Sequence, residues 1–192
     1  DDLYRLTTAS TTFAATGNDY IRTYAYSPTG NITNKSDQGA YSYQGDQGTS
    51  YANPHAVTDI NGTTYAYDKN GNLISDSTWT YGWNYNNTLA SSTDSVITVD
   101  YGYDHNKQRV SYDNGTSTIA YANKYYNTTT ATTTRHIFAG NQLVATIEGT
   151  GIATTTNYIH TDHLGGTHII SDENGVKVQL LDYYPFGEAR LN

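Results

Sequence analysis

The sequence predicts an all-β protein made of tandem antiparallel β-hairpins, and three observations support this fold class. The 192 residues include 20 tyrosines and many threonines, which favour strands, and 17 glycines with many asparagines and aspartates, which favour turns. No stretch combines good helix formers with the apolar spacing of a helix. Asn-Gly pairs lie between β-branched or alternating runs, which is the strongest short-range signal for a hairpin.

Strand–turn–strand units of about twenty residues follow one another along the chain. Residues 1–7 have the form of the second half of such a unit, and a full unit at residues 24–32 carries Ser27 where an aspartate is expected. The clearest unit, YAYDKNGNL, spans residues 65–73. Less regular units follow, at residues 79–89, 101–110 and 136–144. An isolated hairpin is only marginally stable in water, so we expect neighbouring units to stabilise one another by stacking.

The unit at residues 65–73 has a structural explanation that needs no ligand. Its two tyrosines are two positions apart and should share one face of a strand, where each buries about 150–250 Å². The aspartate should accept backbone N–H groups in the turn, and the glycine should supply the residue with positive φ. The leucine then returns to the apolar face. The structural residues of this unit are Tyr65, Tyr67, Asp68, Gly71, Asn72 and Leu73.

The threonine-rich stretch at residues 128–134 has no clear periodicity. It is predicted to be either an irregular loop or a strand that carries little information about its register.

Residues 158–188 form the most distinctive part of the sequence. They begin with a strand at 158–160 and a turn through Asp162, and a second strand follows at 167–170. A turn at residues 172–175 contains Asn-Gly, and the chain returns as a strand over 176–181. The sequence Tyr184-Pro185-Phe186-Gly187 ends this strand.

Two motifs in this stretch, HTDHLG at 160–165 and DYYPFGE at 182–188, resemble the core of Rhs (rearrangement hotspot) and YD-repeat proteins. With the upstream repeats, the resemblance covers most of the chain. It divides the sequence into degenerate repeats at residues 1–157 and a core-type segment at 158–192, which together form one repeat sheet truncated at both ends. The motif residues of the core-type segment are Asp162, His163, Leu164, Gly165, Tyr184, Pro185, Phe186 and Gly187.

The resemblance implies a curling antiparallel sheet that is part of a larger shell. Larger members of the family wind such a sheet into a hollow shell, as in bacterial Rhs toxins, insecticidal toxin complexes and teneurins. It also implies a non-enzymatic segment of a secreted or cell-surface bacterial protein, whose shell encloses a C-terminal toxin used in competition between cells. The partners would be the rest of the same polypeptide or that toxin. Rhs proteins often cleave themselves with aspartates of a D-P-x-G-type motif after the core, and this sequence does not contain that motif, so no catalytic residue is carried over.

Two other functions are compatible with the sequence. An extracellular fibre or adhesin subunit could self-associate through open sheet edges. A carbohydrate-binding module could stack surface glycans on Trp79 and Trp83, although packing within the sheet is the other explanation for these aromatic residues.

His160, Asp162, His163 and His168 are the only dense group of metal-ligand side chains in the sequence. Their spacing would suit a His/carboxylate site. The alternative, which we favour, is that Asp162 and the histidines order a turn. Asp162, Asp172 and Asp182 could suggest acid/base chemistry, but each lies at a turn or a strand end. We therefore predict no metal site, no catalytic residue and no cofactor.

Composition excludes several classes of protein. The chain has no cysteine and no methionine, so disulfides and thiolate metal sites are excluded. Its net charge of −8 and the lack of a basic stripe argue against nucleic-acid binding. No apolar run approaches the roughly twenty residues that a membrane helix needs.

Overall fold

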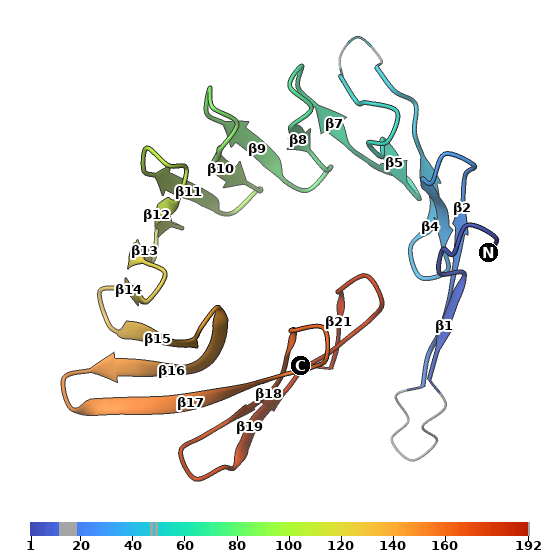
Figure 1. The fold of residues 1–192 in the computed structure, drawn as a ribbon. Helices are drawn as coiled ribbons and strands as arrows, with labels where there is room; N and C mark the ends of the chain where they lie inside the picture. Colours follow the sequence, from blue (N-terminus) through green and yellow to red (C-terminus); the bar gives the residue numbers. More distant parts are fainter. Residues whose placement is uncertain (12–18, 47, 49, 192) are drawn as a thin grey trace. The chain divides into compact units, whose positions relative to one another are not determined.

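A computed structural model describes residues 1–11, 19–46, 48 and 50–191. These residues form strands and turns without a helix, which confirms the predicted all-β class (Figure 1). Nothing in this part of the chain could cross a membrane as a helix. The chain divides into two compact units, Asp1–Thr98 and Val99–Asn192, which we describe separately.

The first unit contains two runs of antiparallel strands, and in each run strands that are consecutive in sequence are neighbours. The first run pairs β1 to β6, and the second pairs β7 to β10. The strands are β1 (Thr8–Ser10), β2 (Ile21–Tyr26), β3 (Ile32–Lys35), β4 (Gly39–Ser42), β5 (Asp59–Ile60), β6 (Thr63–Thr64), β7 (Ala66–Tyr67), β8 (Leu73–Ser75), β9 (Thr80–Trp83) and β10 (Leu89–Thr93).

The second unit contains an antiparallel meander from β11 to β19, followed by a separate hairpin of β20 and β21 (Figure 1). β16 and β17 are nine residues each, and residues 145–150 of β16 pair with residues 153–158 of β17 in regular register. The strands are β11 (Thr98–Tyr103), β12 (Arg109–Asp113), β13 (Thr118–Asn123), β14 (Tyr126–Thr128), β15 (Thr133–Ala139), β16 (Gln142–Thr150), β17 (Ala153–Thr161), β18 (Thr167–Ser171), β19 (Lys177–Leu180), β20 (Asp182–Tyr183) and β21 (Ala189–Leu191).

The strands predicted in the distinctive C-terminal stretch are confirmed. Residues 158–160 lie in β17, residues 167–170 lie in β18, and the returning strand is β19. The division that we predict between residues 157 and 158 separates sequence motifs, and in the structure it falls within β17.

The threonine stretch is neither of the two predicted alternatives, because it contains a turn between two strands. β14 ends at Thr128 and β15 begins at Thr133. The Thr129 backbone N–H donates to the Thr132 carbonyl at 2.8 Å, and the Thr129 hydroxyl oxygen accepts the N–H groups of Ala131 and Thr132. A threonine hydroxyl can thus order a turn that contains no glycine.

Few side chains of the described residues are buried. Tyr24, Ala52, Val99 and Ala145 are the buried apolar residues, and no large side chain in the described part is completely excluded from solvent. Large apolar side chains remain exposed, including Ile137 and Tyr158, which lie on the same sheet face because both pair with Ala145. Contacts between neighbouring strands therefore stabilise this fold more than a central core does.

Candidate functional site

The turn after β7 shows how the repeat unit closes. The Asp68 N–H donates to the Asn72 carbonyl at 2.9 Å, and the Gly71 N–H donates to the Asp68 carbonyl at 3.0 Å. One carboxylate oxygen of Asp68 accepts the N–H groups of Asn70 and Asn72. Gly71 has a φ of +83°, the left-handed conformation that this position requires. The pairing of Tyr67 with Leu73 then includes a β-bulge, as is common in three-residue hairpin loops.

The same pair of backbone hydrogen bonds occurs in eight turns of the described chain. The residue at the fourth position has positive φ in every case. Five turns have glycine there, whereas Tyr4, Asn87 and Lys107 take the left-handed conformation without being glycine. The turns begin at Asp1, Ser27, Asp68, Asn84, Asp104, Asp162, Asp172 and Tyr184.

The two motifs that carry the family resemblance are both turns of this kind. In DHLGG, one carboxylate oxygen of Asp162 accepts the N–H groups of Leu164 and Gly166 at 2.8 and 2.9 Å. The hydrogen bond from Gly166 is the main cause that holds the pKa of Asp162 below its usual value, and His163 and Leu164 contribute in the same direction. Sequence reasoning missed that this motif shares its geometry with the YD unit. The shared spacing of aspartate and glycine three positions apart could have revealed it.

In YPFGE, Tyr184 stands where five of the other turns have aspartate. Pro185 occupies the next position, where its fixed φ suits the first turn residue. Gly187 has a φ of +91° and donates to the Tyr184 carbonyl at 2.9 Å. Proline therefore helps to order this turn without a carboxylate.

In several units an aromatic residue directly before the turn donates a side-chain hydrogen bond to a carbonyl of another segment. The hydroxyl of Tyr67 donates to the Val57 carbonyl at 2.8 Å, and Trp83 Nε1 donates to the Leu73 carbonyl at 2.8 Å. Further bonds of this kind run from Tyr26 to the Leu6 carbonyl and from Tyr183 to the Thr167 carbonyl. Tyr43, which does not precede one of the eight turns, also donates to a carbonyl, that of Ile32. The tyrosine of the YD pair is thus a hydrogen-bond donor to another segment, in addition to the packing role that the sequence predicts. Burial raises the pKa of Tyr67, and it acts in the same direction on Tyr43.

The other residues of the clearest unit lie around this turn. Tyr65 is half-buried and lies between β6 and β7, and Leu73 begins β8 half-buried. The Asn72 side-chain amide donates to the second Asp68 carboxylate oxygen at 2.9 Å and to Asn87 Oδ1 at 3.0 Å. Asn72 therefore links its own turn to the next turn, a role that sequence spacing alone did not indicate.

The predicted metal-ligand group is dispersed in the structure. His160 Nε2 lies 2.9 Å from the Ser171 hydroxyl, and His168 Nδ1 lies 2.8 Å from the Leu181 carbonyl. Asp162 holds its turn, and His163 is an exposed residue of that turn. The expectation that the histidines order a turn is wrong for His160 and His168: His160 contacts Ser171 in β18, and His168 contacts the Leu181 carbonyl between β19 and β20. Within the described ranges no three histidine or acidic side chains are grouped to hold a metal ion.

The His160–Ser171 contact places a potential base beside a hydroxyl nucleophile, but it lacks the other parts of a hydrolase site. Ser171 is 8% exposed in β18 and is the register partner of Tyr158. No described carboxylate is hydrogen-bonded to the second ring nitrogen of His160, so nothing orients the imidazole as a base. The contact is best explained as a cross-strand hydrogen bond.

The three C-terminal aspartates each have a structural partner. Asp172 caps its turn by accepting the N–H groups of Asn174 and Val176. The Asp182 carboxylate forms an ion pair with Arg190 across the β20–β21 hairpin. With Asp162 in its turn, none of these carboxylates is arranged with another for acid/base work.

The two predicted glycan-stacking residues differ in their surroundings. Trp83 is half-buried and donates to the Leu73 carbonyl, so it occupies the position that Tyr67 has in the preceding unit. Trp79 is also half-buried, and its backbone N–H is bound by the Asp76 carboxylate in a turn. A carbohydrate surface on these residues remains a prediction.

The DHLGG and YPFGE turns together border a cavity of about 340 Å³. Leu164, Tyr183, Tyr184 and Pro185 contribute its apolar lining. The hydroxyl of Tyr183 reaches the Thr167 carbonyl just beyond the first turn, which brings the two motifs together. The two sequence motifs thus lie together in the structure and are linked by the hydrogen bond between Tyr183 and Thr167.

Comparison with known proteins identifies the family. The family described as Teneurin YD-shell matches residues 4–191. The crystal structure of TcdB2-TccC3 is similar at a TM-score of 0.50 and 15% identity, covering 97% of this chain and 15% of that chain. The structure of TcdB2-TccC3 without its hypervariable C-terminal region is similar at a TM-score of 0.51 and 14% identity, and the match covers 97% of this chain and 14% of that chain.

No curated protein sequence matches the chain significantly. The chain spans about one seventh of the length of the solved chains that it matches, and at this level of identity the likeness concerns the fold. These matches confirm the resemblance to Rhs and YD-repeat proteins. Because the family match covers nearly the whole sequence, the chain belongs to the Teneurin YD-shell family.

Proposed function

We propose that this chain is a non-enzymatic wall segment of a secreted or cell-surface YD shell that encloses a C-terminal toxin of the same polypeptide. The observation that carries the proposal is the combination of regular turns and aromatic cross-strand bonds with very little buried apolar surface. Such a segment extends a sheet by repetition and leaves its faces available for contact with other parts of a larger assembly.

The exposed face of the second unit is consistent with this role. Ile137 and Tyr158 are 43% and 45% exposed although both lie in the middle of long strands. Monomeric proteins rarely leave contiguous apolar surface on a central strand without a partner. In a shell wall this apolar surface would have such a partner, because the inner face of the wall would contact the enclosed polypeptide.

A C-terminal toxin as the enclosed polypeptide is supported by comparison. The similar TcdB2-TccC3 protein has a hypervariable C-terminal region that can be removed while the rest still crystallises. A shell chain with a separable C-terminal region is the organisation that we propose for this protein. It would act outside the cell, in competition between bacteria.

Limited proteolysis of the complete natural protein would test the proposal. We expect the region that follows the shell sequence to resist protease in native buffer and to become cleavable in the same denaturant range that unfolds the sheet. The control is the C-terminal region expressed alone, which should be cleaved without denaturant. If the C-terminal region is digested equally fast in both contexts, or if no further region follows the shell, encapsulation is wrong.

A second candidate is self-association into a fibre or adhesin, which is favoured by one observation. β19 is the last strand of its meander, and Val178 within it is 60% exposed. An edge strand with exposed apolar residues can pair with another chain, although Lys177 beside it disfavours this. Regular polymers of the complete protein in electron micrographs would support this candidate over the shell.

A further inference from the structure

A cavity of about 550 Å³ lies at one end of the β12–β13 pair, entirely within the second unit. The regular register between these strands ends at Ser111 and Ala120. Residues 108–110 and 121–124, which lie beyond this last pair, line the cavity. Bulges in the two flanking hairpins, at Tyr103 and Asn123, accompany the separation of the strands.

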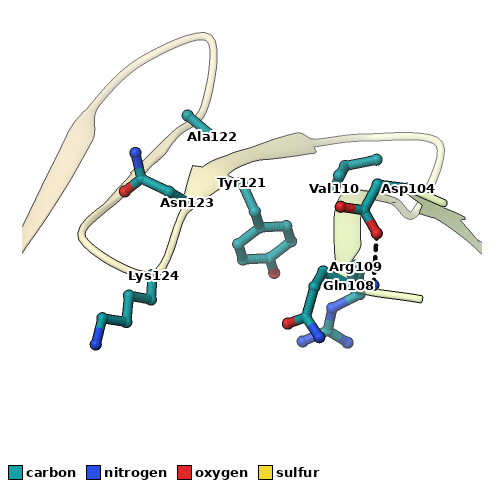
Figure 2. Close-up of a pocket in the computed structure, with 8 residues that line it drawn as sticks. All are labelled: Asp104, Gln108, Arg109, Val110, Tyr121, Ala122, Asn123 and Lys124. Carbon is teal, nitrogen blue, oxygen red and sulfur yellow. Dashed lines mark hydrogen bonds between the residues drawn. The ribbon is translucent and has the colours of Figure 1, made fainter. Parts of the chain in front are cut away.

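Two cations border this cavity in a chain whose net charge is −8. The Arg109 guanidinium carbon lies 5.1 Å from the centre of the Tyr121 ring and 5.9 Å from that of Tyr101. Lys124 Nζ lies 4.9 Å from the centre of the Tyr125 ring. Figure 2 shows the Tyr121 ring between Lys124 on one side and Arg109 with Gln108 on the other.

Neither cation is neutralised by the protein. Among the residues that the structure describes, no carboxylate is within ion-pair distance of Arg109 or Lys124. This distinguishes Arg109 from Arg5, Arg22 and Arg190, which all pair with aspartates. The one carboxylate in the lining, Asp104, accepts the N–H groups of Asn106 and Gln108 and so belongs to its turn. The aromatic rings hold the guanidinium in place while its N–H groups remain available to a ligand.

We propose that this cavity, which we call the Arg109 pocket, binds an acidic saccharide, meaning a sugar ring that carries a carboxylate. Arg109 would bind the carboxylate through paired N–H groups, and Lys124 would add a second positive charge. Tyr121 offers an aromatic surface for the apolar face of the sugar ring, as aromatic residues combine an apolar body with a polar tip. The proposal does not depend on the enclosure of a toxin.

Three features favour this ligand class over other anions. The side-chain amide of Gln108 can both donate and accept, and that of Asn123, whose oxygen accepts the Tyr125 N–H, can still donate through its nitrogen, which suits hydroxyl groups. The overall negative charge of the chain disfavours densely charged polymers such as nucleic acids, but a ligand with widely spaced carboxylates is less affected. The cavity volume lies within the range of about 300–1,000 Å³ that is typical of small-ligand sites.

Calorimetric titration of the full chain with a hyaluronan tetrasaccharide would test the proposal, with chitotetraose as the uncharged match. We expect saturable binding of hyaluronan tetrasaccharide and affinity at least about tenfold lower for chitotetraose. Arg109→Gln should weaken hyaluronan binding by about tenfold or more, because it removes a charge-assisted bidentate contact. Arg109→Lys keeps the charge without the planar donors and should give an intermediate affinity.

Arg135→Gln is the matched control, because Arg135 is an exposed arginine of β15 in the same unit and does not line the pocket. It should leave binding unchanged, and thermal unfolding should show that all three variants are folded. If Arg109→Gln and Arg135→Gln lowered the affinity for hyaluronan tetrasaccharide equally, the assignment of binding to this pocket would be wrong. Equal binding of chitotetraose would overturn the role of the carboxylate. Equal or tighter binding of tetraglutamate would assign the pocket to an acidic peptide, and absence of hyaluronan binding would refute the proposal.

Discussion

The Tyr183 hydroxyl donates a hydrogen bond to the Thr167 carbonyl at 2.9 Å, and this contact joins the two motifs that define the family in this sequence. Thr167 is the first strand residue after the DHLGG turn, and Tyr183 is the last before the YPFGE turn. The bond therefore links two turns that are separated along the chain by the turn at Asp172. Equivalent bonds from Trp83 and Tyr67 show that the aromatic residue before a turn has this role elsewhere in the chain.

Removing this hydroxyl should destabilise the sheet. Tyr183→Phe should lower the free energy of unfolding by about 1 kcal/mol, because the partly buried Thr167 carbonyl loses its donor. Urea denaturation followed by circular dichroism would measure this. Tyr85→Phe is the control, because Tyr85 is 99% exposed, and it should change stability very little. An equal effect of both variants would contradict the assigned role of Tyr183.

Backbone conformation predicts opposite effects at two equivalent turn positions. Lys107 has a φ of +63° without being glycine, so Lys107→Gly should raise the free energy of unfolding by about 0.5–1 kcal/mol. Gly71→Val should lower it by about 1–2 kcal/mol. A Cβ atom at Gly71 would meet no other atom within 4 Å, so this cost would come from the backbone rather than from a clash. Unchanged melting temperatures for both variants would refute the turn assignment.

The lowered pKa of Asp162 predicts a pH-dependent loss of stability. Its folded-state pKa lies below the unfolded value of about 3.9, because Gly166 and Leu164 donate hydrogen bonds to the ionised carboxylate. Its contribution should therefore be complete above about pH 5 and should be lost as the pH falls through the folded-state pKa. Denaturation curves measured from neutral to acidic pH should fall less steeply in Asp162→Asn. Identical pH profiles would contradict this contribution.

Trp83 can be tested as a structural residue. Trp83→Phe should lower the free energy of unfolding by about 1–2 kcal/mol, because the Leu73 carbonyl loses the indole donor at 2.8 Å. Trp79 makes no indole hydrogen bond within the described part of the chain, so Trp79→Phe should cost less. Thermal unfolding of both variants would provide the comparison. A full-stability Trp83→Phe variant that loses glycan binding would instead favour the carbohydrate surface.

The sequence is informative where local chemistry decides the structure. Asp68 and Gly71 predict their turn because a carboxylate acceptor and a residue with positive φ are both needed within four positions. The strands around residues 158–181 follow from β-branched runs between such turns. The same reasoning places units at residues 79–89 and 101–110, but it does not find the positive φ of Lys107, because a lysine rarely adopts the left-handed conformation.

Features that depend on strand neighbours were not predictable in this way. The donors of Tyr67 and Trp83 reach carbonyls on other segments, and those partners are known only once the register is known. His160 and His168 are close in sequence, but their hydrogen-bond partners, Ser171 and Leu181, lie in different parts of the chain. The Arg109 pocket arises because β12 and β13 separate after Ser111 and Ala120, and the bulges that accompany this separation leave no simple sequence signal.

The eight repeated turns have a consequence for how the surface of this protein can change over time. The backbone-to-backbone hydrogen bonds of each turn involve its first, fourth and fifth residues, and the aspartate carboxylate, where present, also binds the backbone N–H of the third. The side chains at the second and third positions form pairs as different as Lys69-Asn70, His163-Leu164 and Pro185-Phe186. Substitutions at these two positions should spread through a lineage without disturbing the strands. Each turn thus has two positions at which selection can change the surface chemistry without changing the strands. The same positions would suit the insertion of peptide tags or epitopes.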